Sequence, residues 1–346
     1  MKTSRIGVIV LAVLVVGVGI YAGYSYYHSD HSNPLIVYSA DAYVAESNYL
    51  LSGYHNASGA SVLKAKGGGS FTDAREISQG DPANAFISVS RSSYEKSYLG
   101  PRYSGWAVAF ASDQLVLAYT SEYSNLTEKT LVKNIVDQFG TALENNNPHN
   151  YSQAYNNLTS GKVTVGISNP SSDPAGLRGW ISLEIAGKLY AGNENYYTTA
   201  IMKNQGVRNS TSAAELVSPL TTGNIQFLFI YRSVAVSEHL PFIELSNYTN
   251  FGNASMASFY SSFSYNTASG AASGSPILLL VSSLAGNGAL NGTSLNFTVY
   301  VVEHSNEMAS FGLTPLVKPV LYNDTSVPSP VETLLSQGKI TSGGTI

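Results

Sequence analysis

The sequence predicts an α/β fold, in which short buried strands alternate with helices along a chain of 346 residues. Three observations lead to this class. Apolar, partly β-branched runs that are typical of strands recur along the chain, and segments with apolar residues at helical spacing lie between them. Hydrophobic residues make up 44% of the chain, which is enough for a packed core and too much for a disordered protein. Because strands and helices alternate, we expect largely parallel sheets.

The first part of the body supplies several strand regions and a helix. Residues 35–38 and 83–89 are short apolar runs that predict buried strands, and residues 41–51 predict a helix. Residues 106–119 form a longer apolar run that the polar tripeptide 112–114 interrupts. We therefore expect two strands there, joined at the polar break.

The later part continues the alternation. An amphipathic helix is predicted by apolar residues at helical spacing, namely Leu131, Val132, Ile135, Val136, Phe139 and Leu143. Strands are predicted at residues 162–167, 225–231 and 276–281, and helices at residues 174–190 and from Ser233 onward. The segment 267–275 is rich in Gly, Ser and Ala and breaks the pattern, which suits a return connection between two halves of the chain.

The first 27 residues predict a membrane anchor or a secretory signal. Lys2 and Arg5 precede an uncharged apolar run at residues 6–23, and tyrosines cluster at its end. The run reaches the lower limit of length for a spanning helix, and tyrosines suit a membrane interface. A cleaved signal is the alternative. The positive end is expected in the cytoplasm, so we expect residues 28–34 to be a linker and the body to lie outside the cell membrane.

Composition narrows the possible chemistry. Charged residues make up 12% of the chain, about half the usual ~25%, the formal net charge is -4, and there is no cysteine. Disulfides and thiolate metal sites are excluded, and the mild negative charge argues against nucleic acid as a partner. Such a surface would change little in acid, which suggests an acidic exterior. Sequons along the body predict an N-glycosylated extracellular surface, and they include Asn56, Asn125, Asn150, Asn157, Asn209, Asn247, Asn253, Asn291, Asn296 and Asn323.

Patterns for catalysis are absent from the sequence. The histidines are scattered without metal-ligand spacing, and there is no nucleophile elbow, kinase signature or dinucleotide signature. We therefore expect a protein that is not an enzyme and that needs no cofactor or resident metal.

Four segments have the strand–turn–helix form that places ligands at the carboxyl ends of strands, where helix N-termini favour anions. They are residues 38–41, 67–70, 168–174 and 231–233. Each also has a purely structural interpretation. Ser70 and Asp173 suit helix N-caps, Asp173 especially because Pro174 follows it, and residues 67–69 suit a flexible turn. Tyr231 suits the core.

The same segments resemble the archaeal-type tungstate/molybdate-binding proteins of ABC importers. Residues 166–178, G-I-S-N-P-S-S-D-P-A-G-L-R, are similar to that family's G-F-S-N-P-N-D-D-P-C-G-Y-R. Residues 106–120 end in V-L-A-Y-T as the family does, and residues 227–235 and 242–245 are similar to its Y-L-F-I-Y-K-S-V-A and F-I-E-L. Gly312-Leu313-Thr314-Pro315 matches a final G-Q-P segment. The matches keep their order over most of the chain from Leu35.

The resemblance implies a two-lobed, type II periplasmic-binding-protein fold. Lobe I would hold residues 35–113 and 275–346, and lobe II residues 114–274. It also implies capture of a small oxyanion, tungstate or molybdate, for the permease of an ABC transporter. The candidate ligand-binding residues are Ser39, Asp41, Ser70, Asp173 and Tyr231, with no metal ligands among them.

The binding loops depart from the family pattern. The family's first loop is H-A-G-S-L, whereas this chain has Asp41 in place of its glycine and Ala42 in place of its serine. The second loop keeps its serine as Ser70. Asp173 matches one family carboxylate, but Ala213 lies near the position of the other, and Glu215 would replace it only after a shift of two residues.

Two alternatives to oxyanion transport therefore stay open. One is a receptor of the same fold for another ligand, such as a cation or a solute with hydrogen-bond donors, because Asp41 and Asp173 would face one cleft. The other is a membrane-anchored surface protein that keeps the fold for adhesion or as a subunit of an envelope complex.

Overall fold

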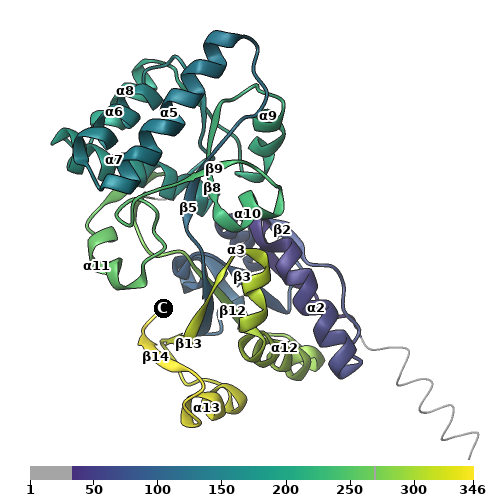
Figure 1. The fold of residues 1–346 in the computed structure, drawn as a ribbon. Helices are drawn as coiled ribbons and strands as arrows, with labels where there is room; N and C mark the ends of the chain where they lie inside the picture. The colour runs from purple at the N-terminus through teal and green to yellow at the C-terminus, as the bar shows by residue number, and fades with distance from the viewer. Residues whose placement is uncertain (1–32, 269) are drawn as a thin grey trace, which may run out of the picture.

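The computed structural model of this chain describes residues 33–268 and 270–346, and Figure 1 shows them as two bodies joined one above the other. The predicted anchor at residues 1–27 lies outside the described residues and stays a prediction. Among the residues that are described, no helix is long and apolar enough to cross a membrane.

One body is built on a seven-stranded sheet, and we call it the seven-stranded half. Its strand order is β14-β13-β4-β12-β3-β1-β2. The strands are β1 (Val37–Ala40), β2 (Lys66–Gly68), β3 (Ala85–Ser88), β4 (Trp106–Ser112), β12 (Leu278–Ser283), β13 (Thr314–Asn323) and β14 (Thr341–Gly344). Its helices include α2 (Val44–Ser58), α3 (Ser70–Ser78), α4 (Lys96–Leu99), α12 (Asn291–Glu303) and α13 (Ser329–Ser336).

The other body, the five-stranded half, has the strand order β7-β6-β8-β5-β9. Its strands are β5 (Leu115–Tyr119), β6 (Val165–Gly166), β7 (Val207–Arg208), β8 (Phe227–Tyr231) and β9 (Phe242–Glu244). Its helices include α5 (Leu126–Asn145), α6 (Pro148–Leu158), α7 (Pro174–Ala191), α8 (Tyr196–Lys203), α9 (Val217–Thr221), α10 (Arg232–Ser237) and α11 (Ala257–Tyr260). In Figure 1, α5 to α8 gather on one side of this half.

The α/β class is confirmed, but the expectation of largely parallel sheets is wrong. Strand β12 runs antiparallel to both β3 and β4, and β5 runs antiparallel to both β8 and β9. The reason lies in the path of the chain. Strands β4 and β5 carry it from one sheet into the other, and β12 brings it back between two strands already in place. Both sheets are therefore mixed.

Most predicted elements are confirmed with shifted ends. The break at residues 112–114 separates β4 from β5 as expected. The helix predicted from Leu131 to Leu143 is the middle of α5, which buries Val132, Ile135 and Phe139 on one face. The segment 267–275 differs from its prediction, because Gly270–Ser273 is a strand, β11, that forms a hairpin with β10 (Ser264–Thr267) before the chain returns.

The crossing between the halves is fastened at Asp113, which lies between β4 and β5. One oxygen of this buried carboxyl accepts hydrogen bonds from the Tyr43 hydroxyl at 2.8 Å and from Ser233 Oγ at 2.5 Å. Its other oxygen accepts from the backbone N–H of Gln114 at 2.7 Å. Burial raises the pKa of Asp113, and these donors oppose the shift. Since Tyr43 precedes α2 and Ser233 lies in α10, one side chain ties the crossing to both halves.

A second fastening is Arg178, a buried residue of α7. Its guanidinium donates to the carbonyl of Val89 at 2.9 Å, just after β3, and to the Tyr231 hydroxyl at 2.7 Å, at the end of β8. It also donates to the carbonyls of Ser275 and Pro276 at 3.2 Å, on the returning segment. Arg178 thereby links α7 to three separate parts of the chain. Helix α7 holds it there because its first four turns are buried almost completely.

Replacing Arg178 by Met should lower the free energy of unfolding by about 2–4 kcal/mol, because the buried carbonyls and hydroxyl would lose charged hydrogen-bond donors. Denaturant unfolding measures the change. Arg91→Met is the matched control, since Arg91 is exposed and stacks 5.0 Å above the Tyr322 ring, which is expected to contribute less than about 1 kcal/mol. Equal losses for the two variants would contradict the role given to Arg178.

Candidate functional site

The four strand–turn–helix segments lie where the two halves meet. Residues 38–41 join β1 to a 3-10 turn, residues 67–70 join β2 to α3, residues 168–174 join β6 to α7, and residues 231–233 join β8 to α10. The rings of Tyr43 and Tyr231, from opposite halves, have centroids 5.8 Å apart. The strand–turn–helix form of these segments is as the sequence predicted, and the cleft between them stays a prediction.

Three successive glycines are closely packed, and the last of them meets the other half. A methyl group built on Gly67 would lie 3.5 Å from the Cα of Asp41, and one built on Gly68 would collide with Oδ1 of Asp73. One built on Gly69 would collide with the carbonyl oxygen of Ser172 and lie 3.7 Å from the Cα of Asp173. The predicted flexible turn is therefore wrong. Residues 67 and 68 belong to β2, and the glycines are needed for close approach.

Asp173 begins α7 and is almost fully buried. Its Oδ1 accepts a hydrogen bond from the backbone N–H of Ala175 at 2.9 Å, so the predicted N-cap is confirmed. Its Oδ2 accepts from the backbone N–H of Ala213 at 2.8 Å. Both oxygens therefore have backbone donors, which favour the charged carboxylate.

Ser70 is not the N-cap that the sequence predicted. Gly69 takes the cap position, Ser70 is the first residue of α3, and its side chain makes no capping bond. The Ser70 hydroxyl is fully buried and has no hydrogen-bond partner within the protein, and the same is true of Oδ2 of Asp73 in the next turn. A buried polar atom without a partner is costly, so each of these atoms calls for an explanation.

Three carboxyl groups share this region and shift one another. Burial, then the charge of Asp173, raises the pKa of Asp41 to about 7. Burial, then the charge of Asp41, raises the pKa of Asp73 to about 8. Burial also raises the pKa of Asp173, against its backbone donors and Arg178. Ionising all three carboxyl groups together in a region of low dielectric constant is costly, so the group of three retains protons near neutral pH.

The two other candidate residues are already engaged. The Ser39 hydroxyl lies 2.8 Å from that of Ser47 and donates to the carbonyl of Ala40. The Tyr231 hydroxyl accepts from Arg178, and its ring is buried, as the core interpretation expected. Asp41, Ser70 and Asp173 are therefore brought together around the glycines. The hydroxyls of Ser39 and Tyr231 are instead hydrogen-bonded to other residues of the protein.

Glu215 does not take the place of the missing family carboxylate. Its oxygens are held by Ser210 and Thr211 of its own loop, and the side chain is exposed. Ala213 contributes its backbone N–H to Asp173 instead of a side chain. Among the described residues, no group of three or more acidic or histidine side chains is placed to hold a metal ion together.

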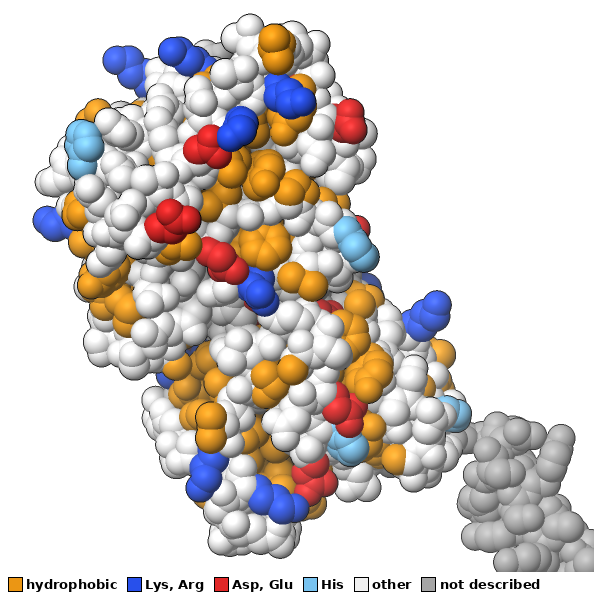
Figure 2. All heavy atoms as spheres, in the orientation of Figure 1, with side chains coloured by type: hydrophobic (Ala, Val, Ile, Leu, Met, Phe, Trp, Pro, Cys, Tyr) orange, Lys and Arg blue, Asp and Glu red, His pale blue; other side chains and the backbone are white. Residues whose placement is uncertain are grey.

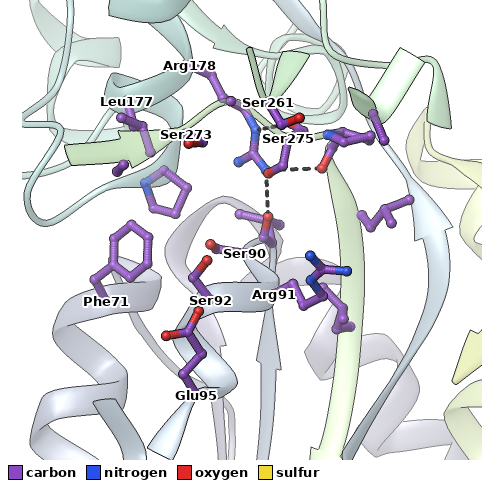
Figure 3. A pocket seen from close by; sticks show the side chains of 18 of the residues that line it. Phe71, Ser90, Arg91, Ser92, Glu95, Leu177, Arg178, Ser261, Ser273 and Ser275 are labelled. Atoms are coloured by element: carbon purple, nitrogen blue, oxygen red, sulfur yellow. Dashed lines mark hydrogen bonds between the residues drawn. The ribbon is translucent and has the colours of Figure 1, made fainter. Parts of the chain in front are cut away.

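Beside the glycine contact lies a cavity of about 540 Å³ between the halves. Figure 3 shows Phe71 and Leu177 on one side of it and Ser90, Arg91, Ser92 and Glu95 below, with Arg178, Ser261, Ser273 and Ser275 above. Phe71 and Pro174 follow Ser70 and Asp173 directly, so the same two helix starts border the cavity. The residues that line this cavity were not predicted from the sequence. The only signal for them in the sequence was the serine-rich run at residues 88–93, which begins at the last residue of β3.

Comparisons with known proteins agree on one kind of protein. The family model described as bacterial extracellular solute-binding protein matches residues 35–272. An uncharacterized solute-binding protein of Sulfurisphaera tokodaii is 33% identical over 90% of this chain and 84% of its own length. The molybdate/tungstate-binding protein of Pyrococcus abyssi is 28% identical over 46% of each chain.

Solved structures match in fold. The sulfate-binding protein SubI of Mycobacterium tuberculosis aligns with a TM-score of 0.58 at 12% identity, over 91% of this chain and 94% of its own. The periplasmic molybdate-binding protein of Azotobacter vinelandii aligns with a TM-score of 0.51 at 17% identity, over 78% of this chain and 97% of its own. Because residues 35–272, more than half of the chain, match that family model, the chain belongs to the bacterial extracellular solute-binding protein family.

Proposed function

We propose that this protein captures a small oxyanion, of the tungstate, molybdate or sulfate kind, outside the cell membrane and delivers it to the permease of an ABC importer. The relative from Pyrococcus abyssi and the fold neighbours named for molybdate and sulfate support this ligand class. The predicted anchor at residues 1–27 would keep the protein near that permease, and the body would carry glycans at its sequons.

The observation that carries the proposal is the meeting of two helix N-termini at one point. Helices α3 and α7 begin on either side of the contact between Gly69 and Ser172. A helix N-terminus presents free N–H groups and a partial positive charge, which attract anions. The buried, unpartnered hydroxyl of Ser70 lies in the first turn of α3, where an oxyanion would accept its hydrogen bond.

Capture would work by closure of two lobes about the hinge. We propose residues 35–113 and 275–346 as lobe I and residues 114–274 as lobe II. An open form would separate Gly69 from Ser172 and admit the anion, and the closed form would exclude water from it. Exclusion of water strengthens each hydrogen bond to a charged ligand.

A second candidate is an organic solute, which the cavity beside the site favours. Its volume of about 540 Å³ lies in the range of pockets for drug-sized molecules, well above the need of a single tetrahedral anion. The rings of Phe71 and Tyr98, which both line the cavity, are stacked with their centroids 5.2 Å apart. Serine hydroxyls around the cavity supply polar contacts. Such a solute would raise the melting temperature of the protein when tungstate, molybdate and sulfate do not.

Substituting Ser70 by Ala should weaken tungstate binding about tenfold or more, since the loss of one donor to a buried anion costs about 1–3 kcal/mol. Isothermal titration of the full-length protein at pH 6 gives the dissociation constants. Ser52→Ala is the control, because Ser52 is exposed on α2 of the same half. Unchanged affinity in Ser70→Ala would rule out Ser70 as a ligand contact.

A methyl group at position 69 should block closure. In Gly69→Ala the new atom would meet the carbonyl oxygen of Ser172, so we expect a loss of tungstate affinity larger than that of Ser70→Ala while the protein stays folded. Gly140→Ala is the matched control, because position 140 lies in α5 with open space around it. Titration and thermal melting measure both effects. Wild-type affinity in Gly69→Ala would show that binding does not need this contact.

A further inference from the structure

The candidate site combines features that favour an anion with groups that repel one. Two helix N-termini and a free hydroxyl point to an anion, yet Asp41, Asp73 and Asp173 lie against the same three glycines. An anion with no proton to share would meet like charges there. Any ligand chemistry proposed for this site must account for these carboxyl groups.

The described residues supply only part of the positive charge that would cancel the three carboxyl groups, since the charge of Arg178 acts on Asp173 and that of Lys66 acts on Asp73. None of the three takes part in an ion pair among the described residues. Lys66 acts on Asp73 from β2, but its ammonium contacts Glu76 and Asp81, and the donors of Arg178 are held by carbonyls and Tyr231. The remaining charged groups that act on the cluster are themselves acidic, Glu215 on Asp41 and Glu76 on Asp73.

Two buried atoms show that the region is incomplete as it stands. Ser70 Oγ and Asp73 Oδ2 are shielded from solvent and have no partner in the protein. They lie in the first turn of α3, directly after the glycines. A bound anion would satisfy the Ser70 hydroxyl by accepting its hydrogen bond, and the unpartnered Asp73 oxygen shows that the carboxyl groups here lack donors.

We infer that the site binds its oxyanion together with a proton, and that Asp41 is the residue that carries this proton. The inference rests on the proposed function, because it concerns the same ligand and the same site. The Asp41 carboxyl takes a proton from solvent and becomes a hydrogen-bond donor to an oxygen of the anion. No covalent bond of the anion changes.

Asp41 is the suitable carrier for structural reasons. Asp173 accepts backbone N–H bonds on both oxygens, and these donors oppose its protonation although burial raises its pKa. Asp73 is nearly inaccessible behind Gly68. Asp41 is only partly buried, so it exchanges protons with solvent, and one of its oxygens is already tied to the N–H of Ala42. Its charge interacts with both of the other carboxyl groups.

The direction of the pH effect follows from this position. The pKa of Asp41 is raised to about 7 before any anion binds, and a bound anion raises it further. At pH 8 the free protein is then mostly ionised at Asp41 while the loaded protein is protonated, so binding takes up a proton. Affinity must therefore fall as the pH rises above about 7, by up to tenfold per pH unit for one proton.

Titration calorimetry of the full-length protein with sodium tungstate at pH 6, 7 and 8 tests the inference. We expect a dissociation constant at least tenfold larger at pH 8 than at pH 6. Titrations at pH 8 in two buffers of different ionisation enthalpy should show close to one proton taken up per tungstate. The series is repeated with sulfate, which stays a dianion throughout this range. The same pH dependence with sulfate would place the proton on the protein.

Variants locate the proton. Asp41→Asn keeps the shape and a permanent donor, so its tungstate affinity should vary less than threefold between pH 6 and pH 8. Asp137→Asn, on the exposed face of α5, should keep the wild-type dependence. Asp73→Asn should keep most of it, and loss of the dependence in Asp73→Asn but not in Asp41→Asn would overturn the assignment to Asp41. Thermal melting confirms that each variant is folded.

Different results would overturn the proton inference and the proposed oxyanion function. Tight tungstate binding with the same dissociation constant at pH 6 and pH 8, and no proton uptake, overturns the inference and leaves the proposed function intact. A folded protein that binds neither tungstate nor sulfate at any of these pH values overturns the proposed function, and the inference with it.

Discussion

The arrangement of this molecule depends on one close approach of backbone to backbone, that of Gly69 to Ser172. No side chain fits between them, because a Cβ at position 69 would occupy the place of the Ser172 carbonyl oxygen. This approach brings the starts of α3 and α7 together and places Ser70, Asp173 and Asp41 in one region. Arg178 and Asp113 support it at two other points, one along α7 and one at the chain crossing. The three contacts define how the two halves sit against each other.

The electrostatics of the site follow from the same approach. Closing two helix N-termini onto each other concentrates partial positive charge, and three carboxyl groups offset it at short range. The balance depends on which of them hold protons, and burial leaves that choice open near neutral pH. A site of this kind discriminates among ligands by the protons and donors they bring as well as by their charge. That is a different selection rule from a site lined only by N–H groups and hydroxyls, which prefers a fully deprotonated anion.

Much of the fold was predictable because its signals are local. The break at residues 112–114 marked the crossing from one sheet to the other, and Asp173 before Pro174 marked the start of α7. The mixed direction of the sheets was not predictable, since it depends on β12 returning from the far half. The free hydroxyl of Ser70 was missed for a similar reason. Sequence favours serine at the cap position, but the position belongs to Gly69 because the opposite half leaves no room for a side chain there. The charge coupling of Asp41 with Asp173 arises only once residues 132 positions apart are brought together.

The sparse charge of the surface has a consequence for how fast a solute is captured. Figure 2 shows few Lys, Arg, Asp and Glu side chains on the visible face, several of them in small groups of mixed sign, and the formal net charge of the whole chain is only -4. Such a molecule generates little long-range field, so it neither guides an anion towards the cleft nor strongly repels it at a distance. If the halves open and close as proposed, encounter is governed by ordinary diffusion and by the fraction of time that the open form is populated. The association rate of this protein would consequently be nearly independent of ionic strength, which suits a receptor exposed to surroundings whose salt content is not under the control of the cell.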